Sequence, residues 1–176
     1  MSAQRKSDIL WAPWRMEYIL GEKEKGCIFC TRMKSQEDQK NLILYRGEYN
    51  FIIMNKYPYN NGHLMVVPNR HTSDFESLQD DESLEMMHLI AKSLQVLKAA
   101  IRPHGFNIGI NLGEIAGAGI DDHLHFHIVP RWSADTNFMP VVADTKVISE
   151  GLKETWERLK FFFDRNTYPP LCSYLV

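Results

Sequence analysis

The sequence is poor in three features that mark large protein classes: cysteine, long apolar runs and net charge. Its three cysteines in 176 residues are too few for a disulfide scaffold. No stretch approaches the roughly 20 apolar residues of a membrane-spanning helix, and the start MSAQRKSDILWAPW lacks a signal-peptide core. A net charge of −2 gives no strongly basic face for duplex nucleic acid. We therefore expect a cytoplasmic protein that binds neither membranes nor duplex nucleic acid.

What is present is an ordinary globular composition, 44% hydrophobic and 24% charged, which favours a single domain over residues 1–176. Residues 1–26 look like an irregular N-terminal arm, and 31–41 like a loop or weak helix. Apolar residues recur at every third or fourth position over 80–101, which predicts a long helix. The same spacing after residue 150 predicts a C-terminal helix and tail over 150–176. Short β-rich stretches occupy 42–46, 49–55, 63–68, 106–112 and 123–130. The fold class predicted is α+β, with a mostly antiparallel sheet, one long helix and a C-terminal helix.

The stretch HLHFHIVP, residues 123–130, places a histidine at every second position. Because strand residues alternate between faces, His123, His125 and His127 share one face, which we expect to look outward at a cleft. The intervening apolar residues can then pack under the long helix. Along a strand the three imidazoles span about 13 Å, too far for one zinc ion with bonds near 2.1 Å. A nucleophilic His125 with two helpers fits better, although a polar strand face that happens to be rich in histidine is the plain alternative.

The loop before this row, EIAGAGIDD, is rich in glycine. Glycines let the backbone approach a ligand and point N–H groups at it, so the loop favours an anionic ligand such as phosphate. A tight turn would explain the glycines equally well. Imidazole attack on phosphorus would give a phosphoramidate that a second nucleophile can break.

The stretch HLHFHIVP resembles the defining motif of the histidine triad (HIT) family, His-x-His-x-His followed by apolar residues. Five other stretches resemble the branch of bacterial diadenosine tetraphosphate phosphorylases and related hydrolases: ILWAPWRMEYI, CIFC, NKYPYNNGHLMVVPNRH, GFNIGINLGEIAGAGIDDHLHFHIVPRW and DTNFMPVVADTKV. The resemblance implies a HIT-like α+β sheet extended by homodimerisation. It also implies nucleotidyl transfer or hydrolysis at the α-phosphate of a nucleoside polyphosphate.

Residue by residue, the resemblance makes His125 the nucleophile that carries the nucleotidyl group, and His127 a contact to the phosphate or leaving group. It places Asn111, Gly113 and the backbone of Gly117, Ala118 and Gly119 around the α-phosphate. It also places Asn55 at the nucleoside and Trp132 at the phosphate end. One departure is the loop Ala116-Gly117-Ala118-Gly119, where many family members have Ala-Gly-Gln. The glutamine is missing, so the choice between phosphate and water as second nucleophile stays open.

Cys27 and Cys30 form a C-x-x-C pair, whose spacing suits two thiolates on one tetrahedral zinc. His71 and His123 match positions that bind zinc in related nucleotidyl transferases and in some triad proteins. The predicted set is Cys27, Cys30, His71 and His123, with zinc fixing His123 two residues before the nucleophile. The alternative is a pair of buried, inert thiols with His71 merely capping the next segment.

Two other functions stay open at this point. One is a nucleotide-binding sensor or interaction protein with slow chemistry. The other is a hexose-1-phosphate nucleotidyl transferase, although such enzymes are much longer. His63, which opens the strand at 63–68, could line the cleft, and a surface histidine at a strand start is the alternative.

Overall fold

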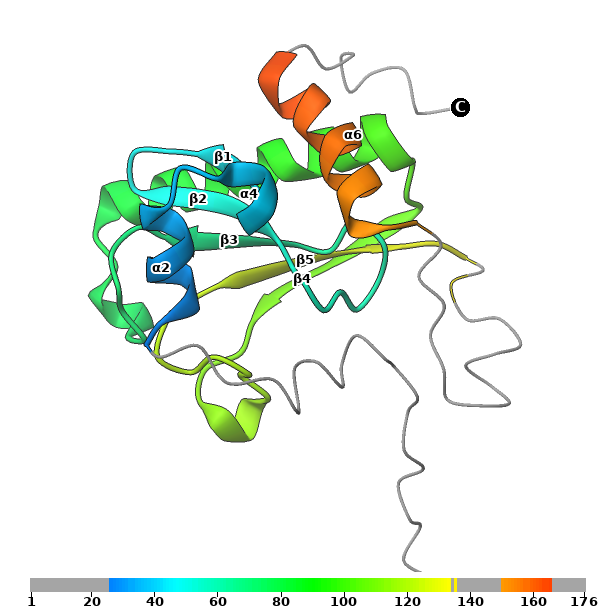
Figure 1. Ribbon diagram of the computed structural model, residues 1–176. Coiled ribbons are helices and arrows are strands. Elements are labelled where there is room, and N and C mark those ends of the chain that lie inside the picture. Colours follow the sequence, from blue (N-terminus) through cyan, green and yellow to red (C-terminus); the bar gives the residue numbers. More distant parts are fainter. Residues whose placement is uncertain (1–25, 134, 136–149, 166–176) are drawn as a thin grey trace, which may run out of the picture.

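The computed structural model describes residues 26–133, 135 and 150–165 (Figure 1). Along the chain its elements are α2 (Ile28–Lys34), α3 (Asp38–Asn41), β1 (Ile43–Arg46), β2 (Asn50–Met54), β3 (Leu64–Pro68), η1 (Phe75–Ser77), α4 (Asp80–Ile101), β4 (Gly105–Ile110), η2 (Glu114–Ala116), β5 (Phe126–Arg131) and α6 (Leu152–Arg165). The predicted long helix is confirmed at α4. Most of the predicted N-terminal arm, the segment 136–149 and the C-terminal tail lie outside the described residues.

The strands form one five-stranded antiparallel sheet in the order β1-β2-β3-β5-β4. This confirms the predicted α+β class. The strand predicted from His123, however, begins only at Phe126, which pairs with Val66 on one side and Ile110 on the other. The segment before it takes a different partner, because the Leu124 N–H donates to the Thr72 carbonyl. His123 and His125 therefore precede the strand.

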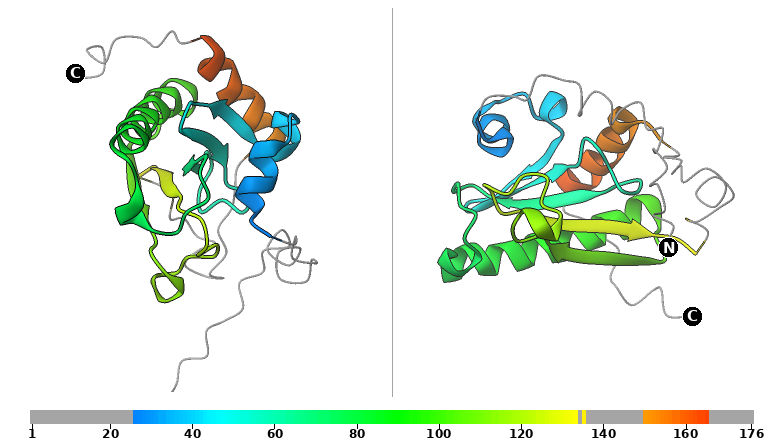
Figure 2. Two further views of the ribbon diagram at one scale, coloured as in Figure 1. Left: turned by 90° about the vertical axis from the view of Figure 1, so that its left-hand side faces the viewer. Right: turned by 90° about the horizontal axis from the view of Figure 1, so that it is seen from below.

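The two faces of the sheet are covered unequally (Figure 2). On one face the larger apolar cluster joins the strands to α4 and α6 and includes Val66, Leu97, Ile128 and Leu159. On the other face a smaller cluster joins Phe29 of α2 to strand residues such as Phe51, Ile53 and Met65. His127 lies on the α2 face, because it pairs with Met65 and opposite residues of antiparallel strands share a face.

Polar side-chain contacts fix the ends of α2, α3 and α4. Gln79 and Glu82 form a capping box at the start of α4, and Glu82 also pairs with Arg70 at 2.8 Å. The polar stretch 31–41 is helical in two short pieces. Arg46 stabilises them, since its guanidinium bonds the Met33 and Ser35 carbonyls and the Asp38 carboxylate. This ties α2, and the two cysteines on it, to the sheet.

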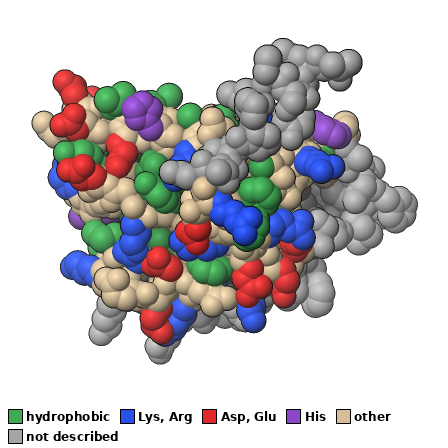
Figure 3. Space-filling view, turned by 90° about the horizontal axis from the view of Figure 1, so that it is seen from above, with side chains coloured by type: hydrophobic (Ala, Val, Ile, Leu, Met, Phe, Trp, Pro, Cys, Tyr) green, Lys and Arg blue, Asp and Glu red, His purple; other side chains and the backbone are tan. Residues whose placement is uncertain are grey.

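The surface reflects the small net charge. In the space-filling view, acidic and basic side chains are interspersed across the visible face, with apolar side chains between them (Figure 3). Among the described helices, none is long and apolar enough to span a membrane.

Candidate active site and metal centre

The first two histidines of the row, His123 and His125, lie against Phe29 of α2 rather than on an open face. His123 and His125 expose only 2% and 5% of their surface, and His127 is half-buried. The Phe29 ring of α2 lies 5.2 Å from the His125 ring and 5.5 Å from the His123 ring. The expectation of an outward-looking histidine face is therefore wrong for this end of the row. The reason is that α2 begins at residue 28 and places Phe29 over it.

His125 is held with one nitrogen occupied and one free for chemistry. Its Nδ1 lies 2.9 Å from the backbone carbonyl oxygen of His123. A carbonyl can only accept, so Nδ1 carries the proton and Nε2 keeps the lone pair. Burial lowers the pKa of His125, and the bond to the carbonyl opposes this only in part. The ring is therefore neutral at pH 7, the form in which imidazole is a nucleophile.

His127 is oriented by a fourth histidine, His63, which is 1% exposed. The Tyr59 N–H donates to His63 Nδ1 at 3.1 Å, so His63 carries its proton on Nε2. That Nε2 lies 3.0 Å from His127 Nδ1 and donates to it. His127 then carries its own proton on Nε2. Burial lowers the pKa of His127 to about 4, with a smaller contribution from His125.

His63 is the residue that sequence reasoning did not place in the site. The sequence left both a position in the cleft and a position on the surface open for it, and the structure buries it. The register of β3 against β5 is the signal that could have placed His63 in the site. His63 immediately precedes β3, which pairs with β5 so that Met65 lies opposite His127. A histidine two residues before Met65 shares that face, and it can reach the row once β3 and β5 are known to be neighbours.

His123 uses its two nitrogens in the opposite sense from His127. Its Nε2 lies 2.9 Å from the Pro68 carbonyl and donates to it, which leaves the Nδ1 lone pair free. This Nδ1 lies 3.2 Å from Cys27 Sγ, 3.7 Å from Cys30 Sγ and 3.2 Å from His71 Nδ1. Burial also lowers the pKa of His123, which keeps the ring neutral and able to ligate a metal.

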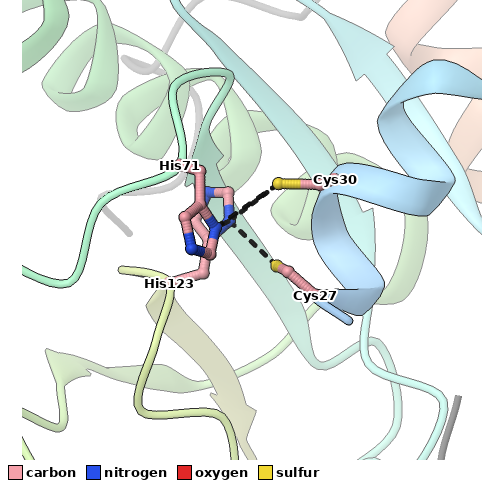
Figure 4. A group of neighbouring side chains, drawn as sticks. All are labelled: Cys27, Cys30, His71 and His123. Atoms are coloured by element: carbon pink, nitrogen blue, oxygen red, sulfur yellow. Dashed lines mark hydrogen bonds between the residues drawn. The ribbon is translucent and has the colours of Figure 1, made fainter. Parts of the chain in front are cut away.

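The four predicted metal ligands come together (Figure 4). Cys27 caps α2 and Cys30 lies in its first turn, and both sulfurs point at the imidazoles of His71 and His123. The four donor atoms lie within 4.8 Å of one another. A tetrahedron with bonds of 2.1 to 2.3 Å has edges of about 3.6 Å, close to the separations found here. Two sulfurs and two imidazole nitrogens are also a donor set that zinc prefers, so the residues fit zinc.

The glycine-rich loop turns sharply beside the row. Gly113 and Gly117 have φ of +82° and +91° and bracket η2, a conformation that residues with a Cβ adopt only with strain. The Asn111 side chain donates to the Gly117 carbonyl at 3.4 Å, which closes the loop. The Ala118 N–H bonds the Gly113 carbonyl, also at 3.4 Å.

The remaining predicted site residues lie at different distances from the row. Asn55 is adjacent, with Nδ2 3.3 Å from His63 Nδ1 and Oδ1 accepting from the Tyr57 N–H. Trp132 follows β5, five residues past His127 and so about 16 Å along the strand. Its backbone N–H donates to Asp135 at 3.3 Å.

Comparison with known proteins gives a consistent picture. Residues 36–134 match the sequence model of the HIT domain. The "AP-4-A phosphorylase" of Mycobacterium tuberculosis is 42% identical over 154 residues, covering 83% of this chain and 79% of that protein. A solved structure of a zinc-bound histidine triad family protein from Mycobacterium smegmatis matches with a TM-score of 0.65 and 22% identity, over 80% of this chain and 95% of that one. A uridylyltransferase structure matches with a TM-score of 0.62 and 18% identity, over 88% of this chain but 50% of that one. The last two likenesses concern the fold alone.

Proposed function

This chain belongs to the histidine triad family, and we propose that it is an enzyme acting at the α-phosphate of a nucleoside polyphosphate such as diadenosine tetraphosphate. The observation that carries the proposal is the orientation of His125. Its Nδ1 is bonded to the His123 carbonyl, and its neutral Nε2 keeps a lone pair. The similarity to an AP-4-A phosphorylase at 42% identity supports the substrate class.

In the proposed first step, His125 Nε2 attacks the α-phosphorus. The N–P bond forms as the bond from phosphorus to the bridging oxygen breaks, and the rest of the substrate leaves as an oxyanion. His127 carries its proton on Nε2, so it can donate a hydrogen bond to the leaving oxygen and stabilise the charge that develops there. In the second step phosphate or water attacks the nucleotidyl-histidine and regenerates the free imidazole.

The cradle for the α-phosphate is proposed from residues around the loop: Asn111, Gly113, Gly117, Ala118 and Gly119. Because Asn111 closes the loop through the Gly117 carbonyl, it would hold the shape of the cradle as well as contact the phosphate. Fixed donors aimed at the developing charge would supply much of the acceleration. Asn55, next to His63, is proposed to contact the nucleoside, and Trp132 the far end of the phosphate chain.

We also propose that Cys27, Cys30, His71 and His123 hold a structural zinc ion. When bound, the ion would supply a rigid link between α2 and the segment before β5. His123 contributes a ring nitrogen to this cluster and a backbone carbonyl to His125, so a link here positions the nucleophile. Reduced thiolates of this kind agree with the cytoplasmic location predicted from the sequence, which stays a prediction.

A product analysis tests the proposed reaction. Labelled diadenosine tetraphosphate is incubated with the protein, with and without inorganic phosphate. ADP plus ATP that requires phosphate identifies a phosphorylase, and AMP plus ATP identifies a hydrolase. His125→Asn is expected to abolish turnover while retaining nucleotide binding. Binding without product from any of several dinucleotides would contradict the enzyme and favour a nucleotide-binding sensor.

We further propose that the chain forms a homodimer through the β4 edge. β4 is the last strand of the sheet and leaves one row of backbone groups unpaired by the described strands. Three large apolar side chains on β4 or just after it are exposed: Ile108, Leu112 and Ile115. A second copy of the chain would pair with this edge and cover part of that surface.

Sedimentation equilibrium tests the dimer. Ile108→Lys is expected to convert a dimer to a monomer, because a buried, unpaired charge at the seam is costly. Phe161→Lys is the matched control, since Phe161 is similarly exposed but lies on α6. A wild-type protein that sediments as a monomer would contradict the proposal.

A further inference from the structure

The aromatic rings around the nucleophile form a connected series of ring contacts, from Phe29 through the histidines to Tyr59. Centroid distances are 5.2 Å from Phe29 to His125, 4.8 Å from His125 to His127 and 5.1 Å from His127 to His63. The Tyr59 ring stacks on His63 at 4.9 Å with an interplanar angle of 28°, and it forms a triangle of neighbouring rings with His63 and His127. Phe29 is fully buried at one end, whereas Tyr59 is 51% exposed at the other.

Tyr59 is fixed by its backbone more firmly than an exposed side chain usually is. Its N–H donates to His63 Nδ1, and the next residue, Asn60, donates from its side chain to the Pro130 carbonyl at 2.9 Å. The connection from β2 to β3 is thereby held against β5, which it passes closely in Figure 1. One face of the Tyr59 ring is stacked on His63, so its exposed area lies on the side away from the histidines.

The neighbours of Tyr59 indicate which part of a bound substrate its exposed ring can contact. Tyr59 also lies 5.9 Å from the ring of His127, the residue proposed to donate a hydrogen bond to the leaving group. Phe29 and the apolar α2 face lie at the opposite end, beyond His125. For a dinucleoside polyphosphate, the leaving group is itself a nucleotide with an aromatic base. Bases stack on exposed aromatic rings with little dependence on their identity.

We propose that Tyr59 is a specificity-determining residue that stacks on the second base of a dinucleoside polyphosphate. The inference rests on the proposed function and deepens it. Stacking on Tyr59 would distinguish substrates that carry a base on the leaving group from those that end in bare phosphate. Its contribution is made to binding on the leaving-group side and not to bond breaking.

The test compares two nucleotides that differ only in the second nucleoside, diadenosine tetraphosphate and adenosine tetraphosphate. Tyr59→Leu is expected to raise KM for the dinucleotide about fivefold or more, and to leave KM for adenosine tetraphosphate unchanged. Tyr59→Phe retains the ring and should behave as wild type. Tyr49→Leu, in the turn at the other end of β2, is the matched control and should alter neither value.

Affinity for both nucleotides is also measured by calorimetry in a His125→Asn background, so that the test does not depend on turnover. Selective loss of dinucleotide affinity without any wild-type turnover would retain the role of Tyr59 and reject the proposed reaction. An equal loss for both nucleotides would mean that Tyr59 merely supports His63 and His127, and would overturn the proposal. Unchanged affinity for both would overturn it as well.

Discussion

The two ends of the histidine row use the same side chain in opposite orientations. At the first end, His123 donates from Nε2 to the Pro68 carbonyl and turns Nδ1 toward two cysteines and His71. At the other end, His127 accepts at Nδ1 from His63 and keeps its proton on Nε2. The first end presents a lone pair to the group proposed to hold zinc, and the second presents an N–H proposed to contact the leaving oxygen.

The difference shows how one short segment can serve two kinds of chemistry. Imidazole has two nitrogens, and whichever one a neighbour occupies decides what the other can do. His125 lies between the two ends and depends on the first, because its Nδ1 partner is the carbonyl of His123. Separate perturbations of the two ends should therefore have different signatures, in stability at the first end and in catalysis at the second.

The largest effect is expected from removing the metal end. Cys30→Ser, or prolonged chelation of the wild type, should lower the free energy of unfolding by several kcal/mol and reduce kcat by about 10²-fold. The reason is that α2, Phe29 and the His123 carbonyl lose their common anchor. Urea unfolding, metal analysis and steady-state kinetics measure this. Lys98→Ala, on an exposed position of α4, is the control. A purified protein without zinc that is equally stable would contradict the metal assignment.

At the other end, His63→Phe is expected to lower kcat by about 10²-fold with little change in KM. The ring shape is kept, but His127 Nδ1 loses its donor and the proton on Nε2 is no longer fixed. His63→Gln retains an N–H donor and should recover part of the rate. Equal kcat values for wild type and His63→Phe would show that the second end does not depend on this contact.

A smaller effect is expected from pH. The folded pKa of His127 is about 4 and its unfolded value is about 6.5, so the unfolded chain binds more protons between these values. This contribution to stability is fully present above pH 6.5 and is lost progressively as the pH falls toward 4. The fall in unfolding free energy from pH 7.5 to 5.5 should therefore be steeper for wild type than for His127→Gln. Parallel slopes would mean that His127 is more solvated than its burial indicates.

The smallest effect concerns the loop that leads into the row. Gly117→Ala should cost about 1 kcal/mol of unfolding free energy through its φ of +91° alone, because an added Cβ would meet only Asn111 Nδ2 at 3.9 Å. Gly105→Ala, at a site with an ordinary φ and nothing within 4 Å, should be neutral. Thermal unfolding of the two variants compares them. A neutral Gly117→Ala would show that the loop relaxes without strain.

Periodicity and spacing predicted much of this molecule. The pattern of apolar residues predicted α4 within its observed bounds, and the C-x-x-C spacing together with the family resemblance predicted four side chains that the structure brings together. Local patterns could not predict events that depend on strand neighbours. β5 begins only at Phe126, because the Leu124 N–H bonds the Thr72 carbonyl instead of a neighbouring strand. His63 is buried because β3 and β5 are neighbours in the sheet.

The central claim is that His125 Nε2 bonds covalently to the α-phosphorus, and trapping that intermediate tests it most directly. The protein is mixed with diadenosine tetraphosphate labelled at the α-phosphate, without inorganic phosphate. It is then quenched at alkaline pH, where phosphoramidates persist, and digested for mass spectrometry. The account predicts one nucleotidyl group on His125 that forms during a single turnover and disappears as phosphate or water releases the product. Label on another residue, or product formation with no labelled protein during a single turnover, would contradict it.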